Sequence, residues 1–152
     1  MSIGYPSRGI SKEANQVRDA LKDVQREFQS AVSLGDRGVV LGELHEVWAN
    51  QCVEGWDGDT ASPILLETKE IADRVIDALP SEIESPSVSG DADGYIVLEW
   101  YRNSRRLVAV SIHQSSWLSW AGLAGSAEYE GRAPFYDTLP HQLLNVIREV
   151  CS

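Results

Sequence analysis

The spacing of the apolar residues changes once along the chain, at Gly94, and this change constrains the fold more than any other feature. Before Gly94 apolar residues recur every three or four positions, as on helices, and after it they alternate, as on strands. Alternation runs through GYIVLEWY (94–101), RLVAVSIH (106–113) and WLSWAGLAG (117–125). Short polar turns join these segments, which predicts an antiparallel meander. A strand near 127–130 and a short edge strand around 86–89 are further candidates.

Helical patterns flank the predicted strands. Ser11 can cap a first helix over 11–33, and the sequence LGDRG at 34–38 is expected to end it. A second helix over 38–53, weakened by Gly42, would fold back on the first as a hairpin. A third helix begins near Leu66 and stops at Pro80, and LPHQLLNVIREV closes the chain as a helix.

These elements predict an α+β fold. It comprises an N-terminal heptad helix, further helices packed on a three- to four-stranded antiparallel meander, and a C-terminal helix. We divide the chain into a helical N-terminal segment, residues 1–53, and an α+β domain, residues 54–152.

The first helix carries a narrow apolar seam. Its apolar residues follow one another at steps of three and four, the heptad spacing of a coiled coil. They are Ala14, Val17, Leu21, Val24, Phe28 and Ala31. A lone seam is marginal in water, so Val17, Leu21, Val24 and Phe28 are candidate oligomerisation residues. The seam can pack within the chain, against a second copy in a homodimer, or on a different protein.

The net charge of −10 comes from the middle of the chain. Residues 38–92 hold two Lys or Arg and twelve Asp or Glu. Such a surface repels nucleic acids and membranes, and attracts basic partners such as proteins that normally hold DNA or RNA. Acidic residues more commonly serve solubility alone. Glu67, Glu70 and Asp73, on the predicted third helix, are candidate partner-binding residues.

Both faces of the predicted strands are rich in apolar and aromatic residues. A sheet with one wet face should show polar residues there. Two explanations stay open: the N-terminal helices form a second covering layer, or one face binds another protein. Because Trp and Tyr anchor interfaces, Tyr95, Tyr101, Trp117 and Trp120 are candidate partner-binding residues.

The stretch EGWDGDTASP at 54–63 resembles a calcium loop only superficially. Counting from Asp57, the glycine and glutamate positions of an EF-hand hold Ser62 and Thr68. We therefore interpret the stretch as a turn in which an aspartate bonds nearby N–H groups and Trp56 anchors in the core. No metal or cofactor is expected.

Catalytic patterns are sparse. The sequence has no nucleophile elbow, no phosphate-binding glycine loop and no paired zinc histidines. Glu99 and His113, with a neighbouring serine, could serve a small hydrolase or transferase. The simpler interpretation pairs Glu99 with Arg105 or Arg106 on the adjacent strand.

Cys52 and Cys151 lie far apart in sequence, and no apolar run approaches the length of a membrane span. The N-terminus also lacks the apolar core of a signal peptide. These features predict a cytoplasmic protein with two free thiols.

Four motifs resemble a widespread group of small uncharacterised bacterial proteins. The motifs are W-D-G, L-E-W-Y, V-S-I and (W/Y)-A-G, the last formed here by Trp120, Ala121 and Gly122. The resemblance covers about residues 54–149 and leaves the heptad helix outside. Such proteins are associated with mobile elements and defence islands, and no activity is attached to them. The resemblance implies a bacterial cytoplasmic protein with a partner and assigns no catalytic residue.

Together these features predict a non-enzymatic protein–protein interaction module. An inhibitor, immunity, antitoxin-like or anti-defence role, for example as an anti-CRISPR protein, against a nucleic-acid-handling partner fits the acidic middle segment. The alternatives are the hydrolase or transferase using Glu99 and His113, and a structural subunit of a larger assembly.

Overall fold

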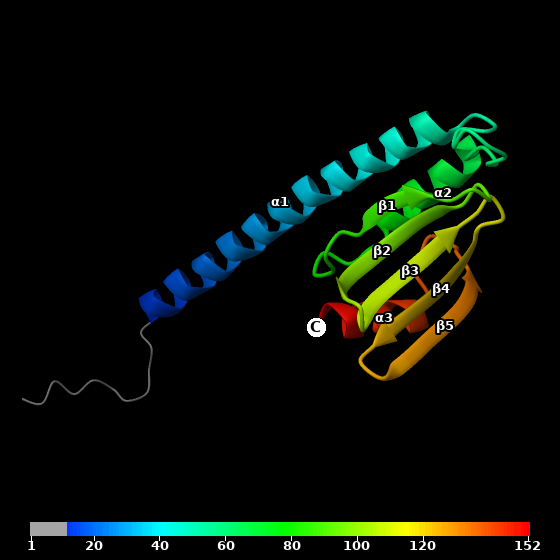
Figure 1. Cartoon of the computed structure of the whole chain (residues 1–152). Helices are drawn as coiled ribbons and strands as arrows, with labels where there is room; N and C mark the ends of the chain where they lie inside the picture. Colours follow the sequence, from blue (N-terminus) through cyan, green and yellow to red (C-terminus); the bar gives the residue numbers. More distant parts are fainter. Residues whose placement is uncertain (1–11) are drawn as a thin grey trace, which may run out of the picture. The chain divides into compact units, whose positions relative to one another are not determined.

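The computed structural model describes residues 12–152, apart from the side chains of residues 12–15 and 27–34. The elements are α1 (Lys12–Gln51), α2 (Leu66–Asp77), β1 (Ser87–Gly90), β2 (Ile96–Asn103), β3 (Arg106–Ile112), β4 (Trp117–Ala124), β5 (Ala127–Pro134) and α3 (His141–Cys151) (Figure 1). The α+β prediction is confirmed, with five strands in the described residues where three or four were expected. The candidates near 86–89 and 127–130 form the two edge strands.

The strands lie in the order β1-β2-β3-β4-β5, and every neighbouring pair is antiparallel. Leu98 faces Val110, which faces Trp120 on the next strand. Residues that face one another point to the same side, so this register sorts the side chains into two faces. We call the face that contains Leu98 the inner face and the opposite face the outer face.

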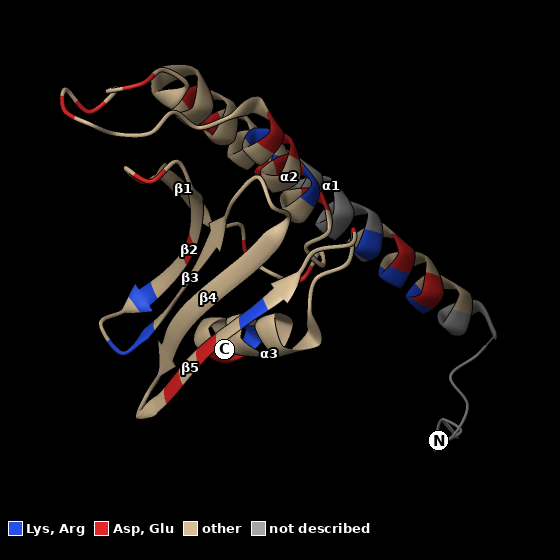
Figure 2. Cartoon of the chain, turned by 90° about the vertical axis from the view of Figure 1, so that its right-hand side faces the viewer, with Lys and Arg blue, Asp and Glu red and all other residues tan. Residues whose placement is uncertain are grey.

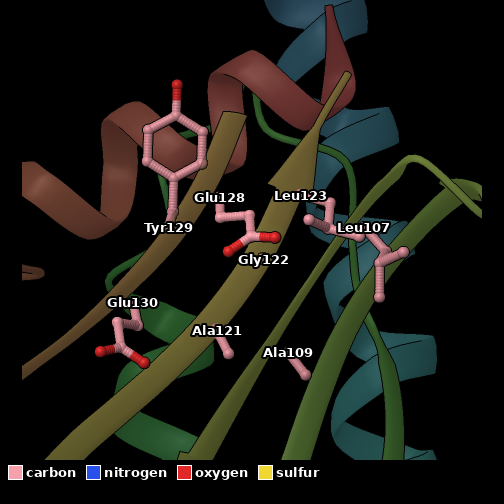
Figure 3. A pocket seen from close by; sticks show the side chains of 8 residues that line it. All are labelled: Leu107, Ala109, Ala121, Gly122, Leu123, Glu128, Tyr129 and Glu130. Carbon is pink, nitrogen blue, oxygen red and sulfur yellow. The ribbon is translucent and has the colours of Figure 1, made fainter. Parts of the chain in front are cut away.

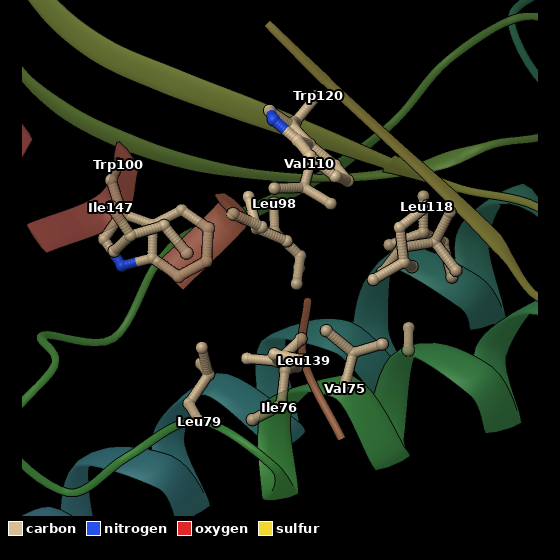
Figure 4. Packing of buried hydrophobic residues seen from close by; sticks show 14 of the residues in the cluster. Val75, Ile76, Leu79, Leu98, Trp100, Val110, Leu118, Trp120, Leu139 and Ile147 are labelled. Carbon is tan, nitrogen blue, oxygen red and sulfur yellow. The ribbon is translucent and has the colours of Figure 1, made fainter. Parts of the chain in front are cut away.

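The hydrophobic core lies on the inner face. Eight of its side chains are almost fully buried: Ile96, Leu98, Trp100, Val108, Val110, Ile112, Leu118 and Trp120. Helices α2 and α3 pack on this face and contribute Ile76 and Ile147 to the same cluster (Figures 1 and 4). Val40 and Leu44 from the second half of α1 are also buried there.

Helix α1 is continuous through residues 34–38, so the predicted break and the predicted helical hairpin are both wrong. Gly35, Gly38 and Gly42 each cost a helix about 1 kcal/mol relative to alanine. Two features of residues 36–51 outweigh that cost. Val40 and Leu44 are buried. The Arg37 guanidinium donates hydrogen bonds to the backbone carbonyls of Asp77 and Leu79 at the end of α2.

The chain divides into two compact units, residues 1–35 and residues 36–152. The sequence placed this division at 53/54. The boundary falls inside α1 because the second half of the helix supplies core residues and the first half supplies none among its described side chains.

Two glycines give opposite expectations for the same substitution. A Cβ on Gly131 would lie 2.3 Å from Cζ2 of the buried Trp120, whereas one on Gly38 would meet nothing within 4 Å. We expect Gly131→Ala to lower the free energy of unfolding by about 1–3 kcal/mol through overpacking. Gly38→Ala should raise it by about 0.5–1 kcal/mol because alanine favours the helix. Denaturant unfolding measures both, and a destabilising Gly38→Ala would contradict a continuous α1.

Candidate functional site

No helix packs on the outer face of the sheet in the part of the chain that the structure describes. Among the described residues, no side chain of β2, β3 or β4 that points to this face is buried. Its centre is aliphatic: Leu107 faces Leu123, and Ala109 faces Ala121. Val97 extends this surface on β2. An antiparallel sheet exposed to water on one side ordinarily places polar residues there. Glu99, Ser111 and Ser119 follow that pattern on the outer face, whereas the aliphatic centre departs from it.

A hollow of about 610 Å³ lies on the outer face (Figure 3). Its lining comprises Leu107, Ala109, Ala121, Gly122, Leu123, Glu128, Tyr129 and Glu130. The short alanine side chains leave space beside the two leucines, and the exposed carboxylates of Glu128 and Glu130 stand on the neighbouring strand β5. The hollow therefore combines an apolar floor with an acidic wall.

Aromatic residues stand at opposite ends of the outer face. Tyr101 is 61% exposed near the end of β2, and Trp117 is 40% exposed at the start of β4. The guanidinium carbon of Arg132 lies 4.6 Å from a ring centroid of Trp117, a cation–π contact. The rings of Tyr95 and His113 are in tilted contact with their centroids 4.6 Å apart, and both residues are half-buried.

Trp120 does not belong to this surface, contrary to its selection as a partner-binding residue. It is 4% exposed and lies in the core on the inner face. Trp117 and Trp120 are three positions apart on one strand, an odd separation that puts them on opposite faces.

The acidic candidates on α2 lie apart from the aromatic ones. Glu67 and Glu70 are exposed on a helix that packs on the inner face, so they belong to the opposite layer from Tyr101. Asp73 is already paired, with its carboxylate 3.2 Å from Nζ of Lys69. The predicted partner-binding residues therefore form two separate surfaces. Four residues of the outer face were not among the predicted partner-binding residues: Leu107, Leu123, Glu128 and Glu130. The alternation in the sequence AEYEGR could have placed the two glutamates on one face of a strand.

The oligomerisation candidates lie on the first half of α1. Val17, Leu21 and Val24 are 60%, 60% and 61% exposed. The side chain of Phe28 lies outside the described residues. The three described candidates thus form an unburied apolar row on the helix.

Basic residues gather at the turn between β2 and β3 (Figure 2), and two of its arginines bond the last carbonyls of α3. Arg102 donates to the carbonyl of Cys151 at 3.2 Å, and Arg106 donates to the carbonyl of Glu149 at 2.7 Å. Positive charge at a helix C-terminus is favourable because the last carbonyls are otherwise unpaired. The expected pairing of Glu99 with Arg105 or Arg106 does not form among the described residues.

Glu99 and His113 do not converge. Both belong to the outer side of the sheet, but Glu99 faces Ala109, four residues before His113 on the next strand. That offset corresponds to about 13 Å along a strand. The hollow is lined by neither residue. The arrangement lacks the mutual contact that a nucleophile, a base and their orienting group require.

Two aspartates organise two neighbouring loops in the same way. Oδ1 of Asp57 accepts hydrogen bonds from the N–H groups of Asp59 and Ala61, at 2.9 and 3.2 Å. Oδ1 of Asp91 accepts from Asp93 and Tyr95, at 2.9 and 3.0 Å. Both sites are thus aspartate-stabilised turns, as predicted for the first.

Trp56 departs from the expectation of a core anchor. It is half-buried and outside the core cluster, and its indole N–H donates to the carbonyl of Ser62 at 2.9 Å. The tryptophan therefore closes the loop and does not enter the core.

The two cysteines are both free thiols. Partial burial raises the pKa of Cys151, since it disfavours the charged thiolate. Among the described side chains, no group of three or more His, Cys, Asp or Glu is placed to hold a metal ion. None of the described helices is both long enough and apolar enough to cross a membrane.

Comparison with protein-family models, with curated proteins and with solved structures found no match to this chain. The resemblance of the four motifs to a bacterial group therefore stays a prediction.

The loop at 54–63 supports a test with a matched control. Asp57→Ala removes two hydrogen bonds and should lower the free energy of unfolding by about 1–2 kcal/mol. Asp59→Ala should change it by less than about 0.5 kcal/mol, because among the described residues the Asp59 carboxylate has no hydrogen-bond or ion-pair partner. Thermal unfolding with and without calcium measures both variants. Equal losses, together with stabilisation by calcium, would show that the loop is a metal site.

Proposed function

We propose that this protein is a non-enzymatic interaction module that binds another protein through the outer face of its sheet. One observation supports this proposal most: an aliphatic surface on the outer face surrounds a hollow, and none of its residues is buried. The surface is formed by Leu107, Ala109, Ala121 and Leu123. Exposed apolar patches of this kind in soluble proteins often mark binding sites. Tyr101 and Trp117 at the two ends add the aromatic residues that commonly anchor interfaces.

The partner we propose is a protein with a basic, nucleic-acid-handling surface. Glu128 and Glu130 border the hollow, and the chain as a whole carries a net charge of −10. Negative charge beside an apolar floor favours a partner segment that presents a basic side chain next to an apolar one. The same charge repels phosphate groups, which argues against direct binding of nucleic acid.

An inhibitor, immunity, antitoxin-like or anti-defence role, for example as an anti-CRISPR protein, is the form of this proposal that we favour. A small acidic protein that occupies a basic surface competes with the nucleic acid for it. The separation of Glu99 from His113 supports a binding role over a hydrolase or transferase. We place this activity in the cytoplasm, and the two free thiols support that placement.

A pair of leucine substitutions tests the proposed surface. Leu123→Glu adds a charge to the hollow, whereas Leu66→Glu adds the same charge to an exposed leucine on α2. We expect Leu123→Glu to lower recovery of the partner from host lysate at least about tenfold, because burying an unpaired carboxylate is costly. Leu66→Glu should leave recovery unchanged. Quantitative mass spectrometry of nuclease-treated pull-downs measures both, and the reverse ranking would assign the interface to α2.

Charge reversal tests which acidic surface matters. Replacing Glu128 and Glu130 with Lys should slow association with the purified partner roughly tenfold or more at low salt. The same change at Glu67 and Glu70 should have a smaller effect, because these residues lie on the helical layer. Surface plasmon resonance at several salt concentrations measures the association rates. Rates that are independent of salt in the wild type would show that the electrostatic part of the proposal is wrong.

A further inference from the structure

The first half of α1 exposes an apolar row that nothing in the proposed function uses. Val17, Leu21 and Val24 are separated by four and three residues, and each is at least 60% exposed. Most other positions around the helix are polar or charged, and they include Asp23 and Arg26, whose charged groups lie 3.7 Å apart. A helix with a single apolar row gains most of its stability by packing that row.

We infer that copies of this chain associate in parallel through this row, as a coiled coil formed by the first half of α1. In heptad notation Leu21 takes position a, and Val17 and Val24 take position d. The sequence continues the pattern with Ala14 and Phe28 at a and with Ile10 and Ala31 at d. This inference is independent of the outer face and of the partner proposed for it.

The heptad pattern ends at residues that cannot continue a coiled coil. The next a and d positions after Ala31 are Gly35 and Gly38, which have no side chain to insert into a neighbouring helix. From Val40 onward α1 packs on the core of the second unit: Val40 and Leu44 are buried in it, and Leu41, Val47 and Trp48 are partly buried against it. The proposed contact therefore covers residues up to about 31, roughly three heptads or about 30 Å of helix.

The charges of this segment favour a second copy as the occupant. Residues 1–37 hold six Lys or Arg and five Asp or Glu, in contrast to the acidic remainder of the chain. Two such segments meet without strong mutual repulsion. A basic partner of the kind proposed for the outer face would gain little from this nearly neutral helix.

The charged positions beside the row select the parallel orientation. Glu13 takes position g and Arg18 takes position e, five residues later. In a parallel coiled coil a g residue lies next to the e residue of the following heptad on the other helix. Glu13 of each copy therefore pairs with Arg18 of the other copy. An antiparallel arrangement with matched a and d layers sets Arg18 beside Gln25 and gains no such pair.

Sedimentation equilibrium of the full chain over a roughly hundredfold range of concentration tests the association. We expect a mass of two or more protomers for the wild type, because Leu at a with a β-branched residue at d shifts the preference from two strands towards three or four. Leu21→Asp should shift the chain to monomer, whereas Gln16→Asp, which adds the same charge at an exposed polar position, should not. An unchanged thermal transition of the second unit would show that both variants remain folded. A monomeric wild type at every concentration would overturn the inference.

Disulfide trapping tests the orientation. With Cys52 and Cys151 replaced by Ser, Val17→Cys should cross-link to itself, because a parallel coiled coil places the two d residues side by side. Cross-links that form only between Val17→Cys and Phe28→Cys chains would establish an antiparallel pair and overturn the parallel assignment.

Charge exchange tests the pairing of Glu13 with Arg18. Arg18→Glu should weaken association, and adding Glu13→Arg to it should restore association if the two residues pair between copies.

Discussion

The register of the central strands is the constraint on which the rest of the molecule depends. Leu98, Val110 and Trp120 form one row across β2, β3 and β4, and all three are buried under the helices. The indole of Trp120 fits there because Gly131 on β5 leaves the space that a Cβ would fill. A shift of one residue in any strand would exchange its buried and exposed side chains, so burial of this row specifies the pairing of the sheet.

The same register creates the outer surface as a consequence. Once Val110 and Trp120 point inward, Ala109 and Ala121 must point outward and face one another. The leucines Leu107 and Leu123 follow on the same side, and the small alanines leave the hollow between them and β5. The core is formed by the inner row and the helices. The aliphatic character of the outer row has no role in the core, which is why we assign it to binding.

Sequence patterns predicted the elements better than the surfaces. Alternation located the strands and Pro80 located the end of α2, because both signals depend on local geometry. Alternation also places Trp117 and Trp120 on opposite faces of the strand. Because both faces carry apolar residues, alternation does not indicate which of the two tryptophans is buried. That choice depends on which face α2 and α3 cover, a tertiary property. Glu128 and Glu130 were missed for a related reason: β5 was foreseen only in part, so its outward residues were not assigned to a face.

The continuity of α1 shows where local signals mislead. Glycines at 35, 38 and 42 predict an interruption, yet burial of Val40 and Leu44 and the capping of α2 by Arg37 hold the second half in place. The glycines have a different consequence, because Gly35 and Gly38 fall at the heptad positions that would continue the exposed row. They thus separate a part of the helix that buries Val40 and Leu44 in its own chain from a part whose described residues Val17, Leu21 and Val24 are exposed. The exposed part of the helix and the outer face of the sheet differ in geometry and charge. The heptad row is narrow and nearly neutral, which favours contact with another copy of the same helix. The outer face is broad and aliphatic with an acidic wall, which favours contact with a basic protein. We therefore propose two distinct occupants for the two surfaces, a second copy for the row and a basic partner for the outer face.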